Sequence, residues 1–287
     1  MATTSPLAWL NLALYALQLV ANRQWARDIG PMSRRYETLL TPAPYAFSVW
    51  GFIYTCVAVP VVVDCFWPAA SVYANAPNAT VLRALFALSC LMNGLWLVLF
   101  TNDAVNAATV ALLVLWFALF VLYAHVVTER RDAGADLWRF VRNELGLTVY
   151  FAWTCGATLI SFAVTAQDVA GGFLSLTSYV TLLSLLVVAA LSAVVYAGDV
   201  TFGLVAVWTL VGLAVKRTTF EPRVELIATN VRACAAQSAA LVTAFIVISL
   251  VHKLLAPAMQ SQSMPPSGAP LYSAKPMQHV DYGTTNA

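Results

Sequence analysis

Charged residues are scarce in this sequence. Only 10% of its 287 residues are Asp, Glu, Lys or Arg, whereas 61% are apolar. A soluble domain carries roughly 25% charged residues, so the composition excludes water as the main solvent of the chain. The net charge of +2 is small and scattered, which excludes a nucleic-acid-binding surface. We therefore predict an integral, multi-pass membrane protein, with the lipid bilayer as its first partner.

The chain also lacks the arrangements that disulfide frameworks, metal sites and common enzymes require. Its five cysteines lie in or at the ends of apolar segments without a CxxC pair, which is typical of packing residues. His125 and His252 have no cysteine or carboxylate at ligand spacing, so we expect no metal and no axial haem ligand. The GxSxG, HExxH, P-loop and GxGxxG motifs are absent. We predict that the protein is not an enzyme and has no covalent cofactor.

Long apolar runs make up most of what is present. A helix needs about 20 mostly apolar residues to cross the hydrocarbon of a bilayer. Runs of about this length predict an all-α, polytopic membrane bundle of about eight transmembrane helices, and seven is the alternative because the first and seventh runs are short. The runs lie at 7–22, 45–67, 81–100, 104–127, 145–166, 173–197, 199–216 and 226–255.

Three of these runs carry a stripe of side chains at positions i, i+3 and i+7, a spacing that places them on one face of a helix. Aliphatic residues would serve a lipid-facing surface equally well, and interfacial aromatic belts lie at helix ends rather than along a face. The stripes are Phe47, Trp50 and Tyr54 in the second run, Asn93, Trp96 and Phe100 in the third, and Tyr150, Trp153 and Ala157 in the fifth.

Each stripe has two interpretations, helix packing or contact with a ligand. Flat conjugated molecules pack on aromatic rings, and ligand pockets are mostly apolar with a few placed polar groups. Asn93 is either such a polar group or the partner of an interhelical hydrogen bond, which is worth about 1 kcal/mol or less in membranes. Asp64 and Arg83 lie at the ends of successive runs and are predicted to pair with each other in a structural role.

At these residues the chain resembles the TspO/MBR family, the translocator proteins also called tryptophan-rich sensory proteins. In that family the second helix opens with a proline-containing turn followed by an aromatic residue, Phe, Trp and Tyr. The third helix has Asn-x-x-Trp and then Phe, and the last core helix has Tyr-x-x-Trp and then Ala. The residues that match these patterns are Pro42, Pro44, Tyr45, Phe47, Trp50, Tyr54, Asn93, Trp96, Phe100, Tyr150, Trp153 and Ala157.

The resemblance extends over about residues 5–166 and implies a long, divergent branch of the family. It implies a five-helix transmembrane core over 1–166, followed by three additional transmembrane helices over 167–257. In the core, a pocket lies between the helices and is capped by the loop after the first helix. Residues 258–287 are rich in Pro, Ser and Gln and are predicted to be disordered.

The family's known ligands imply that the pocket binds a flat apolar molecule, a tetrapyrrole (a porphyrin or a haem-like molecule) or a sterol, in a sensory or transport role. A homodimer is a candidate assembly. The alternatives are a small-solute membrane transporter and a non-catalytic subunit of a membrane complex. The three tryptophans of the stripes are predicted to point into the bundle. The candidate ligand-binding residues are Tyr45, Phe47, Trp50, Tyr54, Asn93, Trp96, Phe100, Tyr150 and Trp153.

Overall fold

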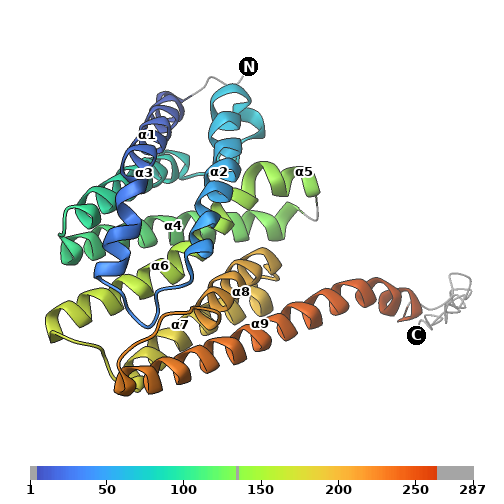
Figure 1. Cartoon of the computed structure of the whole chain (residues 1–287). Coiled ribbons are helices and arrows are strands. Elements are labelled where there is room, and N and C mark those ends of the chain that lie inside the picture. Colours follow the sequence, from blue (N-terminus) through green and yellow to red (C-terminus); the bar gives the residue numbers. More distant parts are fainter. Residues whose placement is uncertain (1–4, 134–135, 264–287) are drawn as a thin grey trace, which may run out of the picture. The chain divides into compact units, whose positions relative to one another are not determined.

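The computed structural model describes residues 5–133 and 136–263, and every regular element among these residues is helical (Figure 1). Eight of the described helices have 15 residues or more, and each coincides with one of the eight predicted runs. These helices are α1 (Pro6–Arg35), α2 (Val49–Phe66), α3 (Ala79–Thr101), α4 (Val105–Ala133), α6 (Leu145–Ala170), α7 (Leu176–Tyr196), α8 (Val200–Ala214) and α9 (Pro222–Ser263). The short elements are η1 (Pro44–Ser48), η2 (Pro68–Ala70), α5 (Leu137–Arg139) and η3 (Phe140–Glu144).

Six stretches, rather than the predicted eight, are both long and apolar enough to cross a membrane among the described residues. They correspond to α2, α3, α4, α6, α7 and α9, so the protein is a polytopic helical membrane bundle. The helix α8 has 15 residues, which at 1.5 Å per residue span about 22 Å, short of the ~30 Å hydrocarbon core. The second half of α1 is polar, which removes that helix from the set.

The polar half of α1 differs from the sequence prediction, which ended the first helix at residue 22 and placed a loop over 23–44. The helix continues to Arg35 because Arg, Gln, Ala and Met favour helix even where the residues are too polar for lipid. Its end is tied to the α3–α4 turn, where Arg35 pairs with Asp103 at 2.9 Å. The Tyr36 hydroxyl donates to Asp103 Oδ1 at 2.6 Å, and this hydrogen bond raises the pKa of Tyr36.

Contacts divide the chain into two units, one of residues up to Ser249 and one from Leu250 onward. The second unit contains the last described part of α9, which reaches Ser263. The predicted disordered tail begins at residue 258. The residues of that tail beyond Ser263 lie outside the described part of the chain.

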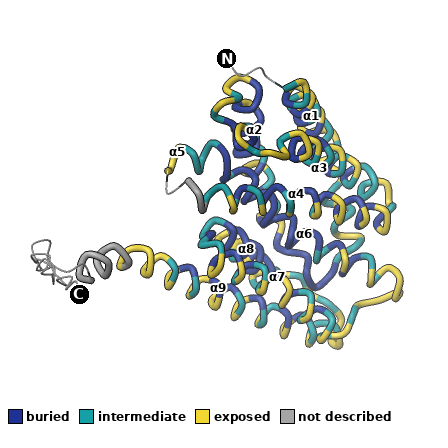
Figure 2. Tube along the Cα trace, turned by 180° about the vertical axis from the view of Figure 1, so that it is seen from behind, coloured by how far each residue is buried: buried dark blue, intermediate teal, exposed yellow. Residues whose placement is uncertain are grey.

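Helix α6 is the centre of the first unit. Of its apolar stretch 78% is buried, compared with 22–44% for the other five candidate spans (Figure 2). It packs against α2, α4, α7 and α8. Its N-terminal end approaches α2 so closely that a Cβ atom on Gly146 would lie 2.6 Å from the carbonyl oxygen of Cys56. This close approach positions the aromatic side chains of α6 beside those of α2.

The segment between α1 and α2 packs against α8. The Ala43 amide donates to the Gly212 carbonyl at 2.9 Å, and the Trp208 indole donates to the Ala46 carbonyl at 3.0 Å. Pro44 is the first residue of the 3-10 helix η1, which leads directly into α2. A proline fits this position because the first turn of a helix needs no backbone N–H donor. The start of α2 is therefore held by α8, one of the three helices beyond residue 166.

Two buried ion-pair clusters join neighbouring helices. The predicted pairing of Asp64 with Arg83 is confirmed, because two guanidinium nitrogens each lie 2.7 Å from a carboxylate oxygen. In the second cluster, Arg130 contacts Glu144 at 2.5 Å and Asp199 at 3.1 Å. Asp199 also caps the N-terminus of α8. The second cluster thus connects α4, the start of α6 and α8.

Candidate functional site, an aromatic-walled cavity

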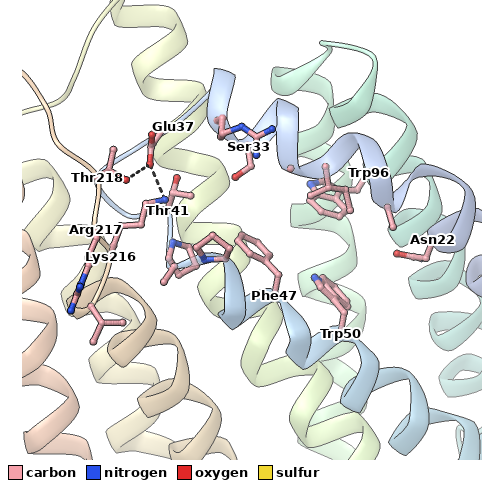
Figure 3. A pocket seen from close by; sticks show the side chains of 18 of the residues that line it. Asn22, Ser33, Glu37, Thr41, Phe47, Trp50, Trp96, Lys216, Arg217 and Thr218 are labelled. Carbon is pink, nitrogen blue, oxygen red and sulfur yellow. Dashed lines mark hydrogen bonds and ion pairs between the residues drawn. The ribbon is translucent and has the colours of Figure 1, made fainter.

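A cavity of about 940 Å³ lies within the first unit. Its walls come from the second half of α1, the segment 41–44, the start of α2, Trp96 of α3 and the α8–α9 linker at 215–218 (Figure 3). Ligand pockets typically have volumes of ~300–1,000 Å³. The cavity is therefore large enough for a ligand of several fused rings, and the segment between α1 and α2 forms part of its lining.

One wall of the cavity is aromatic and is formed by Phe47, Trp50, Tyr54 and Trp96. The Trp50 ring stacks on Tyr54 with centroids 5.5 Å apart and on Trp96 with centroids 6.4 Å apart. Both separations lie in the ~4.5–7 Å range of interacting aromatic pairs. Trp50, Tyr54 and Trp96 therefore form one connected aromatic surface rather than isolated side chains.

The same rings border a second cavity of about 60 Å³. Phe47, Trp50 and Trp96 line both cavities, whereas Phe100 and Trp153 line the small one. The Trp153 ring packs edge-on against Trp50 at 6.2 Å and against Phe47 at 6.0 Å. The prediction that the tryptophans of the three stripes point into the bundle is confirmed, because their rings meet there.

A hydrogen-bond network that runs from the cavity surface into the bundle holds Tyr54 in place. The Tyr54 hydroxyl donates to Asn22 Oδ1 at 2.7 Å, and Asn22 Nδ2 donates to Asn93 Oδ1 at 3.0 Å. The Tyr15 hydroxyl donates to the Tyr54 carbonyl. Asn22 lines the large cavity, but Asn93 is fully buried. Asn93 thus accepts an interhelical hydrogen bond, which is one of the two roles predicted for it.

The opposite end of the cavity is charged. The charged lining residues at this end are Arg34, Glu37, Lys216 and Arg217, which we call the rim, whereas Arg23 lines the cavity next to Asn22 at the aromatic end. Lys216 Nζ lies 2.8 Å from Glu37 Oε1, and each side chain is 19% exposed. The Thr218 hydroxyl donates to the same oxygen at 3.1 Å. Figure 3 shows Lys216 and Thr218 reaching from the linker to Glu37.

A comparison with protein families shows which family the chain belongs to. The model of the TSPO-like protein family matches residues 8–248. The chain belongs to the TSPO-like protein family. The match continues beyond residue 166, through α7 and α8 and into α9, so it includes the helices that the sequence prediction treated as additions. The division into a five-helix core and an added part stays a prediction. No curated protein and no solved structure matched the chain.

In this TSPO-like protein the predicted binding residues lie in three kinds of place. Six of them line a cavity, and two are buried behind the wall. Tyr45 lies apart from both groups, because its ring packs edge-on against Trp208 of α8 at 5.1 Å. The six lining residues are Phe47, Trp50, Tyr54, Trp96, Phe100 and Trp153, and the two buried ones are Asn93 and Tyr150. Their role in binding stays a prediction.

Sequence reasoning missed the α1 wall and the linker. The α1 residues that line the cavity recur every three or four positions along one helix face. The predicted loop over 23–44 excluded most of this face from the sequence prediction. The linker carries no such signal, because only the fold brings it beside the start of α2. The missed residues are Leu19, Asn22, Arg23, Ala26, Ile29, Gly30, Ser33 and Arg34 of α1, and Glu37 just after it.

Proposed function

We propose that this TSPO-like membrane protein binds a flat apolar ligand in the large cavity, with a tetrapyrrole as the first candidate and a sterol as the second. The observation that carries the proposal is the aromatic wall of Phe47, Trp50, Tyr54 and Trp96 beside a space of about 940 Å³. A flat conjugated molecule can pack on the faces or edges of such rings, and aromatic pairs of either kind are favourable. The ligand is held without covalent chemistry, in a sensory or transport role.

The size and lining of the cavity favour binding over a purely structural role for the rings. Packing alone would fill the space between α1 and α2, since protein interiors are close-packed and large voids are costly. Here the rings instead border an opening large enough for a ligand. Hydrogen bonds connect Tyr54 to Asn22, which also lines the cavity, and Asn22 to the buried Asn93, so this part of the wall is held in place by the protein's own contacts.

Titration of the purified full-length chain with protoporphyrin IX in detergent tests the proposal. The readout is the shift of the porphyrin's own Soret band, so that removing a tryptophan does not remove the signal. Wild type should bind saturably. Trp50→Ala should weaken binding several-fold, because a lost aromatic contact costs ~0.5–1.5 kcal/mol. A Soret band that co-purifies from cells would support the same conclusion.

Trp138→Ala is the matched control, because Trp138 is 79% exposed and lies on α5 rather than at the cavity. It should bind porphyrin as wild type does, and cholesterol competition then tests the sterol as second candidate. Absence of saturable binding to wild type, or equal affinity of Trp50→Ala, would contradict the proposal. The transporter or the complex subunit would then become the preferred function.

A further inference from the structure

We infer that the cavity selects flat apolar molecules that carry an acidic group, and that this group lies at the rim. The inference rests on the proposed function and adds the chemical class of the ligand. The rim contains three cations and one carboxylate, in a chain of which only 10% is charged. The cations come from two walls that the fold brings together, namely the second half of α1 and the α8–α9 linker.

The rim has an excess of positive charge because its single carboxylate is already neutralised. Glu37 is bound by Lys216 at 2.8 Å and accepts a hydrogen bond from Thr218 at 3.1 Å. Within the described residues, no ion pair is found for the remaining rim cations, which are Arg34 and Arg217. An anionic group on a ligand would meet two uncompensated cations there, and the interaction is favourable because the net charge at this end of the apolar cavity is positive.

The Glu37–Lys216 pair is held in position by helices on both sides. The Arg232 guanidinium of α9 donates to the carbonyl oxygens of Lys216 at 3.5 Å and Thr218 at 3.4 Å. The Gln167 side chain of α6 donates to the Glu37 carbonyl at 3.2 Å. The linker is therefore a positioned wall of the site, and the helices beyond residue 166 contribute directly to ligand selection.

The two members of this pair should affect an acidic ligand in opposite directions. Glu37→Gln removes the one negative charge of the rim and frees Lys216, so an acid should bind more tightly. Lys216→Gln removes a cation and leaves Glu37 uncompensated, so an acid should bind more weakly. Each change should be roughly two- to fivefold, as for a partly exposed ion pair. A pair that served only to hold the linker would change the affinity in the same direction in both variants.

Two probes with the same ring system separate the acid from the apolar body. Protoporphyrin IX carries two carboxylates, and its dimethyl ester carries none. Each is titrated into full-length wild type and the two variants in detergent, with the Soret band as readout. Wild type should bind the acid more tightly than the ester, and added salt should reduce this difference. The ester should bind all three proteins equally.

Arg27→Gln is the control for a change of net charge alone. Arg27 is an exposed α1 residue that does not line the cavity, so its variant should bind both probes as wild type does. If the ester binds wild type saturably but both rim variants shift acid and ester alike, the acid preference is wrong and ligand binding stands. If neither probe binds wild type, the proposed function fails and the inference falls with it.

A phospholipid headgroup could supply the same anionic chemistry, so competition distinguishes the two sources. Phosphatidylglycerol or phosphatidylcholine is added to the complex with protoporphyrin IX. We expect neither lipid to displace the acid. Displacement by phosphatidylglycerol alone, with the same dependence on Glu37 and Lys216, would make the rim a lipid headgroup site and overturn the preference for acidic flat ligands.

Discussion

Gly146, the second residue of α6, tests how closely α6 packs on α2. A Cβ atom there would come within 2.6 Å of the Cys56 carbonyl oxygen and 2.8 Å of the Val57 nitrogen. Nonbonded heavy atoms prefer ~3.5–4.0 Å, so Gly146→Ala requires the two helices to separate by roughly 1 Å. A gap of this size forfeits about a quarter to a half of the attraction at each lost contact.

Two opposing terms set the size of the effect. Overpacking a well-packed core typically costs ~1–3 kcal/mol, whereas alanine is better than glycine inside a helix by ~0.5–1 kcal/mol. The atoms in the way belong to the backbone of α2 and cannot rotate aside. We therefore expect a net loss of about 1–2 kcal/mol, which lowers the melting temperature by roughly 2–4 °C per kcal/mol.

Thermal unfolding in detergent, followed with a thiol-reactive fluorescent dye, measures this loss. Four of the five cysteines are buried in the folded chain, so unfolding makes them accessible to the dye. Gly94→Ala on α3 is the matched control, because no atom lies within 4 Å of its added Cβ. The control should melt at or above the wild-type temperature. If Gly146→Ala does the same, the close packing of α2 on α6 is refuted.

Two further predictions use the same unfolding assay on the buried ion pairs. Asp64→Leu or Arg83→Met alone leaves the partner charge buried and should cost ~3–5 kcal/mol, whereas the double variant should lose less than either single one. A loss in the double variant equal to the sum of the two single losses would show that the pair is not coupled. Asp199→Asn keeps a side chain able to cap α8, so Asp199→Ala should be less stable than Asp199→Asn by ~0.5–2 kcal/mol. Equal melting temperatures for these two variants would exclude the capping role.

The sequence by itself determined the class of the protein and most of its elements. Apolar runs of about 20 residues predict membrane helices because the bilayer leaves backbone polar groups no other partners. All eight predicted runs are helical. The i, i+3, i+7 stripes also placed Phe47, Trp50 and Tyr54 on one face, since helical periodicity depends only on local geometry. The pairing of Asp64 with Arg83 followed from two opposite charges at successive helix ends.

Only the tertiary structure decided which of these residues share a cavity. Tyr45 and Phe47 are two residues apart, yet one packs against Trp208 and the other lines the cavity. The rim depends still more on the fold, because Glu37 and Lys216 are far apart in the sequence and meet only where α8 packs against the start of α2. Periodicity describes one helix at a time. The placement of charges from separate helices depends on how those helices pack, and no local pattern encodes it.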